Sequence, residues 1–345
     1  MSLNGDDINL WATGVVTVVL AAAISVALIL LLRPVLLRYA LARPNARSSH
    51  KAPTPQGGGI AVIVATIIAS YAPEYFFGVA TTAPFAPIFT GAAAMAIVGV
   101  SDDIRPLEVA PRLILEVIII GAVVYLLPAE LRILPQLPFW VERALLVLGG
   151  LWFVNLVNFM DGIDWMTVAE VIPLTAGLAI LAELHALPTY GLIVALALGG
   201  AMAGFAYFNR PVAKLFLGDV GSLPIGLLLA WLLSLVAAGG HLVAAILLPL
   251  YYLGDSTVTL LWRLTRGEPV WRAHRTHFYQ VATERGFSVT DVVARVFVVN
   301  VALAALAITS IIVPGKIAQG VVLLFGAALV SWLLATLARG RNQPD

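Results

Sequence analysis

Apolar runs long enough to cross a membrane recur along the whole chain, and this pattern constrains the fold more than any other feature. A helix needs roughly 20 apolar residues to span the hydrocarbon core of a bilayer. The composition agrees, because 61% of the residues are hydrophobic and 11% are charged, whereas a soluble domain carries about a quarter charged residues. The sequence therefore predicts an all-α, polytopic integral membrane protein.

Eleven membrane helices are expected between the polar and the Pro- or Gly-rich breaks, in one multi-pass domain over residues 1–345. The first apolar run follows acidic residues without a basic segment, so we interpret it as a retained anchor and not as a cleaved signal peptide. A long loop is expected near 261–291. The predicted helices lie near 13–33, 57–73, 86–101, 111–128, 141–158, 166–184, 189–208, 220–237, 241–260, 292–312 and 318–338.

The positive charges predict the orientation of these helices. An odd number of crossings puts the two termini on opposite sides of the membrane. With the N-terminus outside, 17 of the 20 lysines and arginines fall in the inner segments, and only Arg132, Arg143 and Lys316 fall outside. Basic residues favour the cytoplasmic side. The sequence therefore predicts an outside N-terminus and a cytoplasmic C-terminus.

Five polar segments then fall on the same, cytoplasmic side. This arrangement indicates a site facing water-soluble cytosolic material. The alternative is an ion- or proton-coupled transporter, which would need polar groups at mid-membrane depth and paired discontinuous helices. The segments are "RSSHKAPTPQGGG" (47–59), "SDDIRP" (101–106), "NLVNFMDGID" (155–164), "FNRPVAKLFLGDVGS" (208–222) and "WRAHRTHFYQ" (271–280).

Carboxylates in two of these segments are candidates for metal binding or proton transfer. Asp102 and Asp103 are adjacent at the inner end of a predicted helix, where two acids invite a cation or a proton. Asp219 stands between Gly218 and Gly221 before an apolar run. Small neighbours let a phosphate or metal complex approach the backbone, although an Asp in this position can also be a simple helix cap.

The stretch "NLVNFMDGIDW" places two amides and two carboxylates at three-residue intervals. Successive members rotate by about 60° on an α-helix, so Asn158 and Asp161 share a face. Asn155 and Asp164 diverge unless the helix breaks, for which Gly162 is a candidate. Polar contacts between membrane helices are the structural alternative. Intramembrane carboxylates are costly, however, and favour a functional interpretation.

The long inner loop carries Arg272, His274, Arg275 and His277, whose side chains can hold phosphate oxygens. Gly57-Gly58-Gly59 forms either a phosphate-binding loop or a closely packed helix start. The chain has no cysteine, so the acids and amides are the candidate metal ligands. Oxygen ligands of this kind suit Mg²⁺ or Mn²⁺.

Five motifs in this order resemble the polyprenyl-phosphate N-acetylhexosamine-1-phosphate transferase superfamily, also called glycosyltransferase family 4. They are "RSSHKAPTPQGGG", "VSDD", "NLVNFMDGID", "KLFLGDVGS" and "HRTHFYQ". The last motif resembles the branch that initiates O-antigen or similar surface polysaccharides, and it lacks the three-histidine run of the phospho-MurNAc-pentapeptide branch.

The resemblance implies transfer of a sugar 1-phosphate from a UDP-N-acetylhexosamine to undecaprenyl phosphate, with release of UMP. It also implies a bacterial inner-membrane location and is compatible with a homodimer; no nucleic-acid partner is expected. By motif match, Asp219 is the leading Mg²⁺ ligand and Asn158 the second. Asp102 would deprotonate the lipid phosphate, with Asp103 as its partner.

Asp161 and Asp164, by the same resemblance, would position the nucleotide-sugar or support the metal. The residues expected to bind substrate are Asn155, Lys214, Arg272, His274, His277, Gly218 and Ser222.

Four positions depart from the family pattern. Trp165 replaces a glycine and is expected to narrow the sugar pocket or offer a stacking face. Gln56 replaces a common arginine, and Glu116 stands four residues after Arg112 where glutamine is expected. Pro106 takes the place of a third acid. These changes bear on the choice of sugar more than on the type of reaction.

Overall fold

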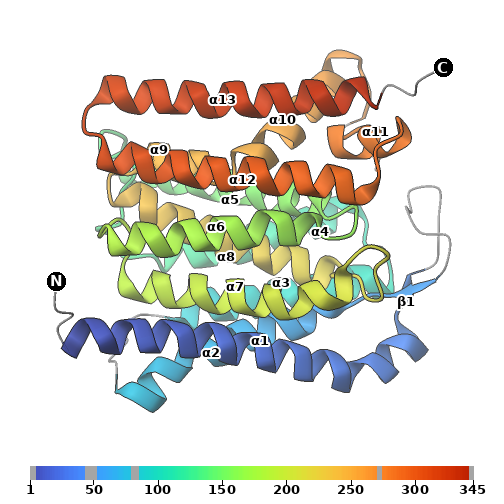
Figure 1. Cartoon of the computed structure of the whole chain (residues 1–345), viewed down its shortest axis with the longest axis horizontal. Helices are drawn as coiled ribbons and strands as arrows, with labels where there is room; N and C mark the ends of the chain where they lie inside the picture. The colour runs from blue at the N-terminus through green and yellow to red at the C-terminus, as the bar shows by residue number, and fades with distance from the viewer. Residues whose placement is uncertain (1–4, 43–52, 79–84, 270–273, 342–345) are drawn as a thin grey trace.

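The computed structural model describes residues 5–42, 53–78, 85–269 and 274–341, and it is a bundle of helices as predicted (Figure 1). Nine helices in these ranges are long and apolar enough to cross a bilayer. The chain is therefore an all-α, multi-pass membrane protein. The helices are α1 (Gly5–Tyr39), α2 (Gly58–Phe77), α3 (Phe85–Ile104), α4 (Val109–Tyr125), α5 (Phe139–Met160), α6 (Met166–Glu183), α7 (Thr189–Asn209), α8 (Asp219–Ala238), α9 (Leu242–Leu247), α10 (Leu250–Thr265), α11 (Phe278–Glu284), α12 (Val289–Ile312) and α13 (Lys316–Arg339).

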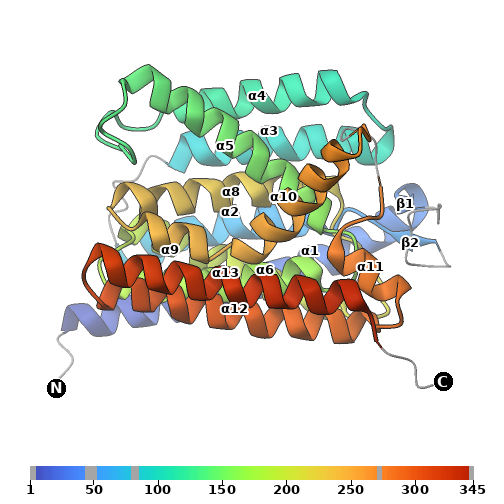
Figure 2. The same cartoon turned by 90° about the horizontal axis from the view of Figure 1, so that it is seen from above.

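Each of the eleven expected positions holds helical structure, with one difference in continuity. The helix expected near 241–260 is divided into α9 and α10, and Pro249 lies at the break. Proline has no backbone N–H to donate to the preceding turn, so it interrupts the helical ladder. Figure 2 shows α10 running obliquely across the bundle. The expected loop near 261–291 also contains a short helix, α11.

Helix α8 lies at the centre of the bundle. The apolar stretch of α8 is 89% buried, whereas that of the first span, Ala12–Arg38, is 22% buried. Residues Leu223, Leu228 and Leu232 of α8 are fully buried. A helix that is apolar on every side can occupy the interior of a membrane protein. The outer helices leave large apolar side chains exposed, as expected of surfaces that face lipid.

One end of the bundle gathers the polar motifs. A short antiparallel hairpin, β1 (Leu41–Ala42) with β2 (Thr54–Pro55), lies at the same end as α11 (Figures 1 and 2). Helix α1 starts at the opposite end from the end of α13 (Figure 1). The number of crossings and the orientation stay predictions.

The three consecutive glycines are a site of close packing. The N–H groups of Gly58 and Gly59 donate to the carbonyls of Phe216 and Leu217, each at 2.9 Å. A Cβ atom on Gly59 would lie 2.2 Å from the Cα of Gly221. Of the two interpretations of this segment, the structure supports a closely packed helix start. These contacts join the "GGG" motif to the segment that leads into α8.

Candidate functional site

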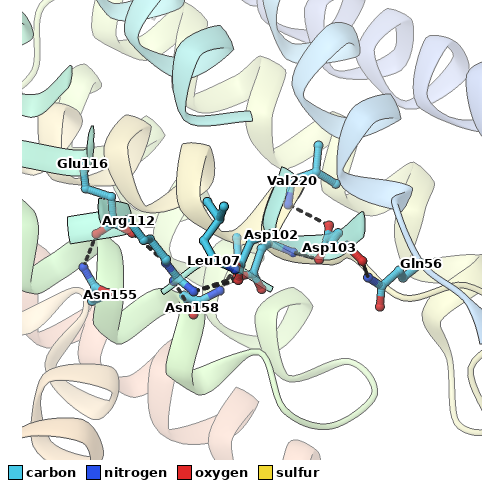
Figure 3. Close-up of polar contacts among 11 residues, drawn as sticks. Gln56, Asp102, Asp103, Leu107, Arg112, Glu116, Asn155, Asn158 and Val220 are labelled. Atoms are coloured by element: carbon cyan, nitrogen blue, oxygen red, sulfur yellow. Dashed lines mark hydrogen bonds and ion pairs between the residues drawn. The ribbon is translucent and has the colours of Figure 1, made fainter. Parts of the chain in front are cut away.

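The two adjacent carboxylates at the end of α3 have different partners (Figure 3). Asp103 accepts hydrogen bonds from the backbone N–H groups of Asp219 at 3.0 Å and Val220 at 3.1 Å. It therefore caps the N-terminus of α8 from another helix, using the N–H groups that α8 itself leaves unpaired. Gln56 donates to the backbone carbonyl of Asp103 at 3.3 Å. Asp103 is thus a positioning residue for Asp219.

Gly218 packs directly against this cap. A Cβ at Gly218 would lie 2.6 Å from Oδ2 of Asp103, and the φ angle of Gly218 is +78°. The glycine is therefore required by the carboxylate of Asp103 and by the left-handed backbone. Its expected role in admitting a phosphate stays a prediction.

Asp102 faces the other way. Its carboxylate accepts from the backbone N–H of Leu107 at 2.6 Å and from Nη1 of Arg112 at 3.0 Å. Its side chain keeps 17% of its surface exposed. Because Asp102 is still reachable, it can meet a substrate, whereas both oxygens of Asp103 are used by the backbone of α8.

Arg112, at the start of α4, joins the separate motifs and was not among the predicted site residues. Its Nη1 donates to Asp102 and also to Oδ2 of Asp219 at 3.1 Å, and its Nη2 donates to Oδ1 of Asn158 at 3.0 Å. Its Nε donates to Glu116 at 2.9 Å. The sequence pattern marks Arg112 only as one of the inner basic residues and as the residue four positions before Glu116. An Arg and a Glu four residues apart inside an apolar run were the available signal.

The two asparagines of α5 point to different partners. Asn155 donates to Oε2 of Glu116 at 2.5 Å. Asn158 donates to Oγ of the buried Ser222 at 2.9 Å, and its Oδ1 faces Arg112. Helix α5 ends at Met160, so the break expected near Gly162 is present. This break decides where the two following carboxylates lie.

Asp161 and Asp164 both bind protein groups beyond the break. Asp161 accepts from Thr167 Oγ1 at 2.5 Å. Burial, reinforced by the nearby charges of Asp219, Asp103 and Asp164 and opposed by the Thr167 bond, raises the pKa of Asp161 to about 8. Asp164 is buried and accepts from the backbone N–H of Ala213 at 2.9 Å. Asp164 thus fixes the loop that precedes α8.

Trp165 packs against α7. Its backbone N–H donates to Asn209 at 2.8 Å and its indole N–H donates to the carbonyl of Ala206 at 2.7 Å. Its φ of +63° places it in the left-handed region. The role of Trp165 in choosing the sugar stays a prediction.

The histidine motif lies beside α5 and α10. His277 is buried, and its Nδ1 lies 3.2 Å from Oδ1 of Asp255. Asp255 is fully buried and also accepts from the N–H of Phe278 at 3.0 Å. The ring of His274 lies 4.8 Å from that of His277. Asp255 was missed in the sequence, where an acid inside the apolar run 241–260 was the signal. Arg272 lies outside the described residues.

A cavity of about 770 Å³ lies among several of the residues described above. One part of its wall is apolar, with Leu148, Leu151, Trp152 and Leu260. The polar part brings together six predicted residues, namely Asp102, Asn155, Asn158, Asp219, His274 and His277, with Arg112 and Gln280 added by the structure. Within the described chain, the predicted residues Asp103, Asp161, Asp164, Lys214, Gly218 and Ser222 lie outside this wall.

Asp219 and Asn158 fit the expected role of metal ligands. Their side-chain oxygens both face the guanidinium of Arg112, so they already converge on a cation. In the parts of the chain that the structure describes, no group of three or more His, Asp or Glu residues converges as a metal cage. Two oxygen donors from the protein suit Mg²⁺, which usually keeps several waters and binds through substrate phosphates as well.

Comparison with known proteins gives a consistent picture. Residues 85–237 match the family model described as glycosyl transferase family 4. A protein of Bacillus subtilis (strain 168) named "Probable undecaprenyl-phosphate N-acetylglucosaminyl 1-phosphate transferase" is 25% identical over 296 residues, which cover 79% of each chain.

Two further relatives are named phospho-N-acetylmuramoyl-pentapeptide-transferase. The one from Lactococcus lactis subsp. cremoris (strain MG1363) is 32% identical over 219 residues, covering 55% of this chain and 64% of the relative. The one from Gluconobacter oxydans (strain 621H) is 26% identical over 303 residues, covering 75% of this chain and 80% of the relative. The matched region of the Lactococcus protein is slightly under two thirds of its length.

Proposed function

We propose that the chain is a member of the superfamily of polyprenyl-phosphate hexosamine-1-phosphate transferases, and that it transfers a hexosamine 1-phosphate from a UDP-sugar to undecaprenyl phosphate. An oxygen of the lipid phosphate forms a bond to the phosphorus that carries the sugar. The bond from this phosphorus to the bridging oxygen breaks, and UMP leaves. The product is a lipid-linked diphosphosugar.

The observation that carries this proposal is the mixed polar and apolar lining of one cavity. Acids, amides and Arg112 form its polar part, and leucines with Trp152 form its apolar part. A substrate with an anionic head and a hydrocarbon chain matches both parts. One relative, the Bacillus protein, is named as a probable undecaprenyl-phosphate N-acetylglucosaminyl 1-phosphate transferase, which supports this choice of lipid substrate.

The residues of the polar wall supply positioning and charge neutralisation. Asp219 and Asn158 would hold Mg²⁺, which neutralises the diphosphate and the charge that develops on the leaving oxygen. Asp102 can accept a proton from the lipid phosphate, and His274 and His277 can hold donor oxygens across the cavity. Bringing two anions together is the main barrier, so these electrostatic contributions would provide most of the acceleration.

The donor is proposed to be a UDP-N-acetylhexosamine for surface-polysaccharide synthesis, on the basis of the "HRTHFYQ" motif. The test is to incubate the purified protein with undecaprenyl phosphate, Mg²⁺ and a panel of UDP-sugars, including UDP-MurNAc-pentapeptide, and to measure UMP release and the lipid product. Asp219→Asn should abolish turnover, and Glu183→Gln, an exposed acid at the far end of α6, should not. Release of no UMP from any donor would refute the proposal.

The site is proposed to face the cytoplasm of a bacterial inner membrane, as the distribution of basic residues predicts. The chain has no native cysteine, so single cysteines can be introduced for labelling. Arg105→Cys, next to the site, should react with an impermeant reagent only from the cytoplasmic side. Lys316→Cys, at the start of α13, should react only from outside. The opposite pattern would reverse the orientation.

A further inference from the structure

Glu116 is a buried carboxylate that touches the site only through other side chains. It has no exposed surface. Its Oε1 accepts from Nε of Arg112 at 2.9 Å, and its Oε2 accepts from Nδ2 of Asn155 at 2.5 Å (Figure 3). Because a buried carboxylate is costly without partners, these two bonds offset the cost of burying Glu116 in this position. Helix α4 and helix α5 are thereby joined next to the metal-ligand candidates.

Arg112 makes contact with more carboxylates than its single charge can neutralise. Asp102, Asp219 and Glu116 all lie within 3.1 Å of its nitrogens. The Nε–H is directed to Glu116, while the Nη groups are directed to Asp102, Asp219 and Asn158. The guanidinium of Arg112 therefore donates through Nε to Glu116, on its own helix, and through its Nη groups to the oxygens that would ligate a divalent cation.

A divalent cation and the Nη groups of Arg112 compete for the same two oxygens. Oδ2 of Asp219 and Oδ1 of Asn158 lie 3.1 Å and 3.0 Å from these nitrogens. Like charges at such separations repel strongly in a poorly hydrated site. The guanidinium must therefore move away when the cation binds, and the Nε bond to Glu116 can persist while the Nη groups turn.

We propose that Arg112 is an exchangeable internal counter-ion for Asp219 and Asn158, and that Glu116 is the positioning residue that retains Arg112 when a divalent cation takes these oxygens. The inference rests on the proposed function only for the identity of the metal ligands. It goes beyond that function, because it assigns to an arginine and a glutamate control over how readily the site accepts its cation.

The test measures binding of Mn²⁺ alone, without nucleotide or lipid substrate, to the full-length protein in nanodiscs by electron paramagnetic resonance. Arg112→Gln removes the competing charge, so the Kd for Mn²⁺ should fall roughly tenfold or more. Glu116→Gln removes the ionic tether and leaves Arg112 on the ligand oxygens, so the Kd should rise roughly tenfold. These changes have opposite signs, although the two variants break the same ion pair.

The double variant, Arg112→Gln with Glu116→Gln, separates positioning from direct attraction. If Glu116 acts through Arg112, the second substitution should change the Kd of the Arg112→Gln protein by less than roughly threefold. Glu116→Asp, which keeps the charge, should restore part of the wild-type affinity. Arg132→Gln breaks a comparable Arg–Glu pair, with Glu142, near the start of α5 and should leave the Kd unchanged.

Equal or weaker Mn²⁺ binding by Arg112→Gln would overturn the proposal. An effect of Glu116→Gln that is as large in the Arg112→Gln background as in wild type would overturn the role of Glu116. Absence of Mn²⁺ binding in both wild type and Arg112→Gln would also overturn it. UMP release is measured separately on the same preparations, so a failure of the proposed transferase reaction remains distinguishable.

Discussion

Replacing Asp103 by Asn should open the start of α8. Both carboxylate oxygens of Asp103 accept backbone N–H groups, from Asp219 and Val220. A hydrogen bond to a charged group contributes about 1.5–3 kcal/mol, and a negative charge at a helix N-terminus adds about 0.3–1 kcal/mol. An asparagine keeps one acceptor oxygen and turns an NH₂ group toward the second N–H.

The expected loss is therefore about 2–4 kcal/mol for the first turn of α8, from one charge-assisted bond and the change in the other. About 3 kcal/mol corresponds to an increase of roughly 150-fold in the open population. Hydrogen–deuterium exchange of a peptide that covers 219–222 reports this opening directly, because these amides exchange from the open state. Mn²⁺ binding should weaken in parallel, since Asp219 is the first residue of the helix.

Asp102→Asn is the matched control. Asp102 is adjacent in sequence, but the backbone group it accepts from is Leu107 in the loop before α4. Exchange at 219–222 should therefore remain close to wild type in this variant. Unchanged exchange in Asp103→Asn, or an equal acceleration in both variants, would refute the assignment of Asp103 as the cap of α8.

Three further predictions follow from other contacts. Gly59→Ala should lower stability by about 1–3 kcal/mol because its Cβ would overlap the backbone of Gly221, whereas Gly121→Ala, with open space around it, should not; thermal unfolding of the two proteins compares them. Asp255→Asn should raise the KM for the UDP-sugar roughly tenfold with a smaller fall in kcat, as the His277 ring loses a charged partner; steady-state UMP release checks this, and an unchanged KM would contradict it. The pKa of Asp161 is raised from 3.8 to about 8, so without metal, in EDTA, the folded protein still binds a proton that the unfolded chain has lost. This contribution to stability is full below pH 3.8 and is lost as the pH rises through 8. Asp161→Asn should therefore flatten the fall in thermal stability between pH 5 and pH 8.

The fold class and most of the polar part of the cavity wall could be predicted from the sequence because both depend on local composition. Long apolar runs form helices in a membrane, since every backbone polar group must be paired within the segment. Polar residues in such a chain are costly, so they mark the site. Asp102, Asn158 and Asp219 were found in this way, and the cavity brings them together.

The separate roles of two acids in the same motif could not be predicted, because each role depends on which backbone groups lie opposite the side chain. Asp102 and Asp103 are equivalent in sequence, yet Asp103 caps α8 and Asp102 faces the cavity. Asp164 resembles Asp161 in its motif, but it binds the N–H of Ala213 in the loop before α8. The break between α5 and α6, over residues 161–165, redirects the side chains within it, so spacing alone does not determine their targets.

By itself, the sequence determined a multi-pass helical membrane protein and the segments that carry its chemistry, because hydrophobic length and the cost of burying charge act along the chain. The tertiary structure alone decided that Arg112 stands among Asp102, Asp219 and Asn158, and that Glu116 holds it there. These contacts join residues up to 107 positions apart. An electrostatic network of this kind exists only when the packing of α3, α4, α5 and α8 brings its members within hydrogen-bonding distance.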